Sequence, residues 1–451
     1  MLMEFAREVE ATQLPDLRLK KRLAKIVDAL STAPNRSIPE VMSSWAATKA
    51  TYAFLDNERV THAAILAGQQ QATQERIAQY AAQGDQVVLL LQDTTSFDYR
   101  HHPATQELGP LENQYTQGFL VHTTLAARPN GVPLGVLEQQ VWTRDAEQTG
   151  QAQKRHERPF QEKESYKWVQ GLPDKDLALT PITVCDREAH IYEFLDEILT
   201  REQQVIVRAS RGRSFTVEGL ELFDAVEQWS PQGHHEVQLK RHPERAPRSA
   251  QVEVRYDTVT LKRPKRANCE RETIAIQVVE VREVNPPKGE AALHWVILTT
   301  LPVTSLEASQ QIVTWYSNRW LIERFHYVLK SGCRLEERQL RSAARLERFL
   351  AVCNQVAWRL LWLTYQARIT PEASCEVALE RDEWQALYAT HHQTQQVPDT
   401  PPSLHEAVRW IARLGGFLGR KSDGDPGVNV LWRGWQRLQD IVATWRLLQA
   451  P

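Results

Sequence analysis

Apolar residues follow two different spacings along this 451-residue chain, and the spacing changes twice. Up to about residue 80 they recur at helical intervals, which predicts a helical N-terminal domain over residues 1–70. Short apolar runs then alternate with helical stretches, which predicts an α/β domain over residues 71–370. Beyond it we expect a helical C-terminal domain over residues 371–451. Tryptophans and leucines at helical spacing there predict a packing surface, which suits a contact between two copies of the chain.

The middle of the chain has a specific order of strands and helices. The run QVVLLLQD (86–93) predicts a buried strand that ends in Asp93. Residues 119–143 predict a hairpin of two strands, because Pro129, Asn130 and Gly131 separate two strand-like runs. The elements expected next are a short helix at 162–171, a strand at 180–186, a helix at 187–201 and a strand at 203–210. Three consecutive strands followed by alternating helices and strands is the order of a ribonuclease-H-like sheet.

Residues from about 211 to 295 interrupt this alternation. They contain several strand-like runs and the basic stretch LKRPKRANCER (261–271), which predicts a β-rich insertion with positively charged loops. An ordinary β subdomain with soluble loops explains the same pattern equally well. The run HWVILTTLPV (294–303) predicts a return to a buried strand.

The stretch WYSNRWLIERFHYVLKSG (315–332) predicts a single helix, since it has no proline and a glycine near its end. At about 100° per residue, Tyr316, Arg319, Glu323 and Lys330 fall within an arc of roughly 60° beside the apolar edge of that helix. A solvated face normally places its charges opposite the apolar stripe. The arrangement therefore indicates a functional surface, although Arg319 and Glu323 also fit a plain surface ion pair.

Composition and charge exclude several classes of protein. Hydrophobic residues make up 42% and charged residues 24%, which is typical of a soluble globular protein. The net charge of −2 means that any DNA-binding surface must come from local basic clusters such as residues 18–25, which could also be a solvated helix face. The five cysteines form no C-x-x-C pair, so no zinc or redox motif is present. The start of the chain lacks the apolar region of a signal peptide, and we expect a cytoplasmic protein without a membrane span.

Three carboxylates are the candidates for chemistry. Asp93 and Asp186 each end an apolar strand, and side chains at adjacent strand ends of an open α/β sheet converge. Either aspartate alone could be a turn residue, and Asp186 could cap the helix that follows it. Together with Glu323 on a later helix they could hold two divalent cations, for which Mg²⁺ or Mn²⁺ is suited to oxygen ligands. Two such ions support in-line phosphodiester displacement without a protein nucleophile.

The other members of the helix stripe fit the same chemistry. Arg319 and Lys330 are cations that suit a DNA phosphate approaching acidic residues. Tyr316 could donate a hydrogen bond to a phosphate oxygen. We therefore expect Glu323 to bind metal and the other three residues of the stripe to hold DNA.

The pattern Tyr-x2-Arg-x3-Glu-x6-Lys, present at residues 316–330, resembles the signature of the DDE-type bacterial transposases of the insertion-sequence-four family. Other segments resemble this family in the same order along nearly the whole chain. They are QDTTSFDYRH around Asp93, VCDREA around Asp186, NPPKGEAALHWVILT before the helix, and IARLGGF and LWRGW near the C-terminus.

The resemblance implies a fold, a reaction and partners. The two aspartates would lie on a ribonuclease-H-like sheet and Glu323 on a later helix, with two Mg²⁺ ions per site and Mn²⁺ as a substitute. Cut-and-paste transposition would proceed by nicking, hairpin formation, hairpin opening and strand transfer. Trp295 would stack on a base flipped out of the hairpin, and Arg208 would lie near the DNA. The partners would be double-stranded DNA, at the transposon ends and the target, and a second copy of the chain, with no small-molecule cofactor.

Two other functions remain open at the level of sequence. One is a catalytically silent DNA-binding relative or an inhibitor of transposition, against which the presence of all three carboxylates argues. The other is a two-metal nuclease of the same fold that cuts DNA without joining it.

Overall fold

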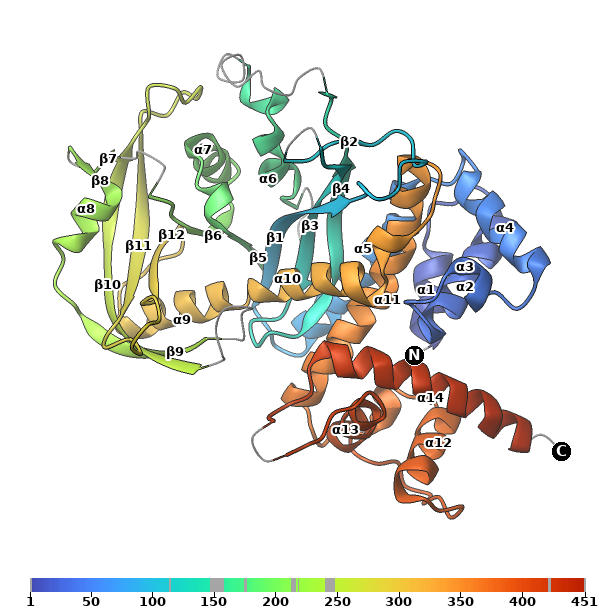
Figure 1. The fold of residues 1–451 in the computed structure, drawn as a ribbon. Helices are drawn as coiled ribbons and strands as arrows, with labels where there is room; N and C mark the ends of the chain where they lie inside the picture. The colour runs from blue at the N-terminus through green and yellow to red at the C-terminus, as the bar shows by residue number, and fades with distance from the viewer. Residues whose placement is uncertain are drawn as a thin grey trace.

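The computed structural model of the chain describes residues 2–112, 115–146, 158–173, 177–211, 216–217, 219–239, 248–420 and 423–449. Figure 1 shows helices at the N-terminus in blue, a large mixed sheet in the middle, and helices at the C-terminus in red. The first and last groups of helices lie on the same side of the sheet, next to each other. The expected order of a helical, an α/β and a helical part is therefore present.

The N-terminal helices begin at polar caps. They are α1 (Leu2–Glu10), α2 (Leu17–Thr32), α3 (Ile38–Val41), α4 (Trp45–Asp56) and α5 (His62–Ala82). Asp16 caps α2 by accepting from the Arg18 N–H, and Ser44 and Thr61 cap α4 and α5 in the same way. The domain boundary expected after residue 70 falls inside α5. That helix packs on β4 and on α11, so its second half is part of the central body.

The strands of the described residues join into one 12-stranded sheet. They are β1 (Val87–Asp98), β2 (Gly109–Pro110), β3 (Gln117–Ala127), β4 (Pro133–Trp142), β5 (Thr180–Cys185), β6 (Gln204–Arg208), β7 (Thr216–Val217), β8 (Leu220–Glu221), β9 (Gly233–Leu239), β10 (Arg248–Lys262), β11 (Thr273–Glu283) and β12 (His294–Thr299). Strands β4, β3 and β1 pair antiparallel, while β1, β5 and β6 pair parallel. This pairing confirms the ribonuclease-H-like order predicted for the sheet.

The β-rich insertion extends the same sheet. Strand β12 pairs antiparallel with β6 on one side and with β11 on the other, and β10, β9, β7 and β8 follow outward. The short helix α8 (Leu222–Glu227) lies within it. The elements between β6 and β12 therefore form a direct continuation of the central sheet, as Figure 1 shows at its left.

Helices cover both faces of the sheet. On one face, α6 (Lys167–Gln170) and α7 (Tyr192–Thr200) bury Trp168 and Phe194 against Val207 and Leu298. The short 3-10 turns η3 (Phe160–Glu162), η4 (Glu164–Tyr166) and η5 (Arg187–Ala189) flank them. The helices α9 (Leu306–Ser317), α10 (Trp320–Tyr327) and α11 (Ala343–Ile369) share a core with the other face. This arrangement fixes which side of the sheet the later helices can supply with functional groups.

The single helix predicted over residues 315–332 is interrupted, and that prediction is wrong in detail. The chain leaves α9 at Ser317 and enters α10 at Trp320, and the backbone between them closes 3-10-type bonds such as Arg319 N–H to Tyr316 O at 3.0 Å. The cause lies outside the helix, because Asn318 Nδ2 donates to Pro129 O at 2.8 Å. A π-turn, η6 (Val328–Gly332), follows α10.

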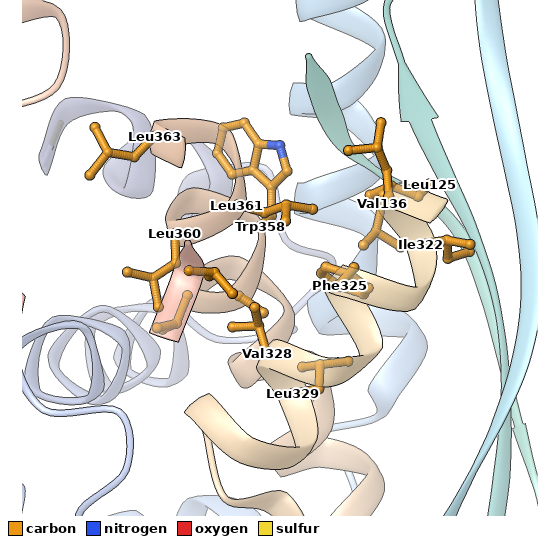
Figure 2. Packing of buried hydrophobic residues seen from close by; sticks show 14 of the residues in the cluster. Leu125, Val136, Ile322, Phe325, Val328, Leu329, Trp358, Leu360, Leu361 and Leu363 are labelled. Carbon is orange, nitrogen blue, oxygen red and sulfur yellow. The ribbon is translucent and has the colours of Figure 1, made fainter. Parts of the chain in front are cut away.

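The buried side of α10 sets its rotation. Ile322 and Phe325 of α10 and Val328 and Leu329 of the following turn η6 are fully buried and point toward α11 and strands β3 and β4, as Figure 2 shows. Burying a side chain of this size contributes about 1.5–3 kcal/mol, so four of them hold the helix firmly. Glu323 lies away from this face and is half-buried.

The C-terminal part is helical as predicted. After the 3-10 turn η7 (Leu335–Glu337) and α11 come η8 (Cys375–Val377), α12 (Arg381–His392), α13 (Leu404–Leu414) and α14 (Val428–Gln449). The apolar residues 349–367 lie in the buried helix α11, whose Asn354 Nδ2 donates to Gln139 Oε1 at 2.7 Å. None of the described helices is long and apolar enough to cross a membrane.

Candidate active site

Asp93 and Asp186 lie at the same level of the sheet. The last parallel pair between β1 and β5 joins Leu91 to Val184, so each aspartate stands two residues beyond a paired position. Side chains two residues apart on a strand point to the same face. Both carboxylates therefore project from the face that carries Leu91 and Val184, on the side of α9 and α10.

The structure corrects the position of Asp93 within its strand. The sequence placed it at the strand's end, but β1 continues to Asp98 because it stays paired with β3, where Asp93 lies opposite Thr123. Only the pairing with β5 stops before it. Asp186 does follow its strand directly, and its Oδ1 also caps the next turn by accepting from Glu188 N–H at 2.8 Å. The capping role and a functional role are thus compatible.

The charge of Asp93 acts on Asp186. Burial raises the pKa of Asp186 above its ordinary value, and the charge of Asp93 raises it further. Burial alone would also raise the pKa of Asp93, but the neighbouring His326, whose Nδ1 lies 3.7 Å from Asp93 Oδ2, and the charge of Arg319 hold it below its ordinary value. Two mutually repelling carboxylates with oxygen-only donor atoms form a pair that a divalent cation would stabilise.

Glu323 forms an ion pair with another side chain of the chain, Arg319. Its Oε1 contacts Arg319 Nη2 one helical turn earlier, and the two side chains are 31% and 16% exposed. Asp93 Oδ2 lies 3.7 Å from His326 Nδ1. Among the described residues, no three His, Cys, Asp or Glu side chains form a group that could hold a metal ion. The donor chemistry of two aspartates fits a divalent cation, while Glu323 is held on Arg319.

His326 was missed in the sequence, although its spacing gave a signal. It lies three residues after Glu323 and therefore on the same side of α10. Its side chain is buried, and its Nε2 has no hydrogen-bond partner in the described part of the chain. A histidine next to an apolar helix edge is easily taken for a core residue, and only the tertiary structure brings it to Asp93.

A second cluster joins the site on the insertion side. The ring of Trp295 on β12 meets that of Tyr316 edge-on, with 5.0 Å between centroids. The guanidinium carbon of Arg208, at the end of β6, is 5.9 Å from the centroid of Trp295, and burial lowers the pKa of Arg208. Trp295 remains half-buried, so part of its ring faces solvent. The three residues come from three separate elements.

Lys330 lies at the opposite end of the stripe. Its Nζ is 3.7 Å from Glu336 Oε1 and 5.5 Å from the ring centroid of Phe97 on β1. The structure thus brings Tyr316, Trp295 and Arg208 together on one side and the carboxylates in the middle. Lys330 stands near the end of β1, beyond Asp93.

Comparison with models of protein families gives three matches. Residues 4–60 match a transposase DNA-binding domain, residues 138–358 match a transposase DDE domain, and residues 355–450 match the transposase Tn5 dimerisation domain. The three ranges follow one another in the order that the hydrophobic pattern predicted. A DDE domain implies a ribonuclease-H-like fold, in agreement with the sheet. The matches also make DNA and a second copy of the chain the expected partners.

Proposed function

Because the chain carries the DNA-binding, DDE and dimerisation domains of a DNA transposase, we propose that it performs cut-and-paste transposition as a member of the insertion-sequence-four family. The reaction would pass through nicking, hairpin formation, hairpin opening and strand transfer at the ends of a mobile element. The observation that carries the proposal is the position of Asp93 and Asp186, each two residues beyond the last β1–β5 pair, on the face covered by α10. DNA transposition would place the protein in the bacterial cytoplasm.

In this proposal Asp93, Asp186 and Glu323 are the metal ligands. Two Mg²⁺ ions, for which Mn²⁺ would substitute, supply activation of the attacking oxygen and stabilisation of the leaving oxygen. The oxygen-only donor set supports this assignment, as do the burial of Asp186 and the charge of Asp93, which together raise the pKa of Asp186. Glu323 would have to leave Arg319 to join the two aspartates.

The residues around the carboxylates would position DNA. Arg319 and Lys330 supply cations for the backbone phosphates, and Tyr316 supplies a hydroxyl. Trp295 would stack on a base that leaves the duplex, because part of its ring is exposed and its other side rests on Tyr316. Arg208 would lie near the same base or its phosphate, since it neighbours Trp295.

The DNA-binding and dimerisation domains assign the remaining roles. The proposed reaction places transposon ends on the N-terminal helices and joins two chains through the helices after α11. We keep the domain boundaries predicted from the sequence, with the second half of α5 in the catalytic body.

A cleavage assay with Mg²⁺ on DNA that carries the element's ends tests the proposal. Asp93→Asn, Asp186→Asn and Glu323→Gln should each lower the nicking rate roughly a thousandfold or more, since a metal ligand contributes several kcal/mol to the transition state. Asp98→Asn is the matched control, because Asp98 lies on the same strand but pairs with Arg100 at the surface. Equal nicking by Asp93→Asn and Asp98→Asn would remove the metal-site assignment.

The same assay separates the competing functions. A silent DNA-binding relative would bind the ends without cutting them under any of these conditions. A nuclease of the same fold would cut the ends, but joined target DNA would not be recovered. Recovery of joined products from the parent chain, and their loss in Asp186→Asn, is the outcome that a transposase requires.

A further inference from the structure

We propose that Arg319 keeps Glu323 away from the two aspartates until a DNA phosphate engages the guanidinium, so that the metal site is completed only on DNA. The inference rests on the proposed function, because it takes these three carboxylates as the metal ligands. It goes further by making Arg319 the residue that couples metal binding to DNA binding.

The first support is the different state of the three carboxylates. Asp93 and Asp186 stand level on neighbouring strands, and the charge of Asp93 reaches Asp186. Glu323 alone has an arginine as its partner, at Nη2 of Arg319. No group of three ligating side chains is formed in the described part of the chain. The missing member is the one that Arg319 holds.

The second support is the environment of Arg319. Its burial opposes the charge, yet the neighbouring Tyr316, Glu323 and Asp93 raise its pKa above the ordinary value, so it stays a cation. Its Nε is buried and has no hydrogen-bond partner among the described residues. Only one edge of the guanidinium is therefore used by Glu323.

The third support is the chemistry of guanidinium groups. Arginine binds phosphate through two parallel N–H donors, and such charge-assisted pairs are stronger than ordinary hydrogen bonds. An i,i+4 ion pair such as that of Arg319 with Glu323 is a weak interaction on an open helix. A phosphate that offers more acceptors can therefore take Arg319 and release Glu323.

Thermodynamic linkage gives the consequence. If DNA binds the Arg319 side of the pair and metal binds the Glu323 side, each ligand favours the binding of the other by the same factor. A chain free of DNA would hold metal weakly, because its third carboxylate is occupied. Random nicking would be suppressed at the level of the metal site.

Metal binding without DNA tests whether Arg319 keeps Glu323 out of the metal site. Mn²⁺ is titrated into the parent chain and into Arg319→Gln, and free Mn²⁺ is followed by its electron paramagnetic resonance signal. Arg319→Gln should bind Mn²⁺ roughly fivefold or more tightly, a typical size for such coupling. The control is Arg324→Gln, which removes the same charge from the same helix at a guanidinium that lies over Tyr327. A gain no larger than that of Arg324→Gln would overturn the inference.

A double variant separates release of Glu323 from a general charge effect. In the Glu323→Gln background, Arg319→Gln should no longer tighten Mn²⁺ binding, because the carboxylate that it frees is absent. A gain that persists there would also overturn the inference. If Arg319→Gln fails to fold, as judged by its melting temperature, Arg319→Met keeps the packing of the buried stem and replaces it.

Metal binding with DNA tests whether a DNA phosphate on Arg319 releases Glu323. A duplex that carries an already cut element end, with no flanking strand left to nick, should tighten Mn²⁺ binding by the parent chain but not by Arg319→Gln. No effect of the duplex on the parent would contradict the coupling. Asp93→Asn distinguishes the two levels of failure. If Asp93→Asn binds Mn²⁺ like the parent, the metal site itself is misplaced. If Asp93→Asn loses Mn²⁺ binding but Arg319→Gln does not bind Mn²⁺ more tightly, only the coupling is rejected.

Discussion

Neighbours across the sheet decide what a single residue does. Asp93 lies in the middle of β1, between Gln92 and Thr94, whose side chains point to the opposite face. On that opposite face, each ring nitrogen of His122 on β3 forms a hydrogen bond. Its Nδ1 lies 2.9 Å from Thr94 Oγ1, and its Nε2 lies 3.1 Å from Gln92 Oε1. The histidine thus braces the two residues that flank the proposed metal ligand.

This bracing has a pH dependence. Burial lowers the pKa of His122 to about 3, whereas an unfolded histidine titrates near 6.5. Between these values the unfolded chain binds more protons than the folded one, so stability falls as the pH is lowered. His122 should therefore lower the free energy of unfolding by about 2 kcal/mol as the pH falls from 7 to 5. In His122→Gln, the melting temperature should drop less over this range than in the parent.

A control makes the source of the effect clear. His101→Gln changes an exposed histidine and should leave the pH dependence of the melting temperature unchanged. If His122→Gln and His101→Gln follow the parent equally closely between pH 7 and pH 5, His122 does not carry the effect.

Trp295 permits a prediction about individual reaction steps. If it stacks on a base flipped from the hairpin, Trp295→Ala should slow hairpin formation by more than the first nick, by about 1–3 kcal/mol or roughly tenfold to a hundredfold. Single-turnover gels that resolve nicked and hairpin DNA measure both rates. Trp229→Ala, in the same insertion, serves as the control for general damage to the fold. Equal slowing of nicking and hairpin formation would count against stacking.

The residue scale also marks how far the sequence alone could lead. Asp93, Asp186 and Glu323 were identifiable from strand ends and helix spacing, and Arg208 and Trp295 from a family resemblance. The contact of His326 with Asp93 depends on how α10 is rotated against the sheet, and that rotation is set by four buried residues. The sequence offered two alternatives, a surface ion pair of Arg319 with Glu323 or a place of both residues beside the aspartates, but it did not predict that the ion pair would form next to the aspartates.

At the scale of elements, the strands were easier to predict than their ends. Continuous apolar runs mark buried strands. Strand β1, however, extends five residues past Asp93, most of them polar, because β3 supplies their hydrogen-bond partners. The break between α9 and α10 has the same origin. Asn318 bonds to the turn of a hairpin almost two hundred residues earlier in the sequence, and no local pattern records that partner.

The crossing of α13 and α14 depends on two glycines. A Cβ on Gly434 would lie 1.7 Å from Ile411 O, and one on Gly415 would lie 1.8 Å from Val430 O. The backbones therefore touch directly, which only glycine permits. Gly434→Ala should force the helices apart and lower the free energy of unfolding by about 1–3 kcal/mol. Loss of the dimer in light scattering should follow, since these helices belong to the dimerisation domain.

The chain offers a matched control for this substitution. Gly427 has open space around the position of a Cβ, so Gly427→Ala should leave both stability and the dimer unchanged. Equal melting temperatures for Gly434→Ala and Gly427→Ala would show that the close crossing does not matter.

At the scale of the whole molecule, one segment is held by two other parts of the chain. Arg338, which follows η7, donates to Pro34 O and Arg36 O between α2 and α3. From the C-terminal part, Trp435 Nε1 donates to Ser31 O at 3.0 Å. The DNA-binding, catalytic and dimerisation regions therefore meet at the end of α2.

Removing Arg338 should loosen this junction. Arg338→Met leaves buried carbonyl groups without a donor, at a cost of about 3 kcal/mol. Limited trypsin digestion should then cut the basic helix α2 faster than in the parent, while the sheet stays resistant. Arg341→Met, at an exposed arginine nearby, should digest like the parent. Identical digestion of both variants would show that Arg338 does not hold the N-terminal helices.

The continuity of the sheet has a consequence for attempts to shorten the chain. Strands β6 and β12 pair antiparallel as a hairpin would, and the insertion occupies the place of the hairpin's loop. A tight turn in place of residues 211–293 would preserve this pair but uncover the edge of β12 that β11 now occupies. Uncovered edges pair with other chains. A trimmed chain should therefore precipitate where the parent stays dispersed.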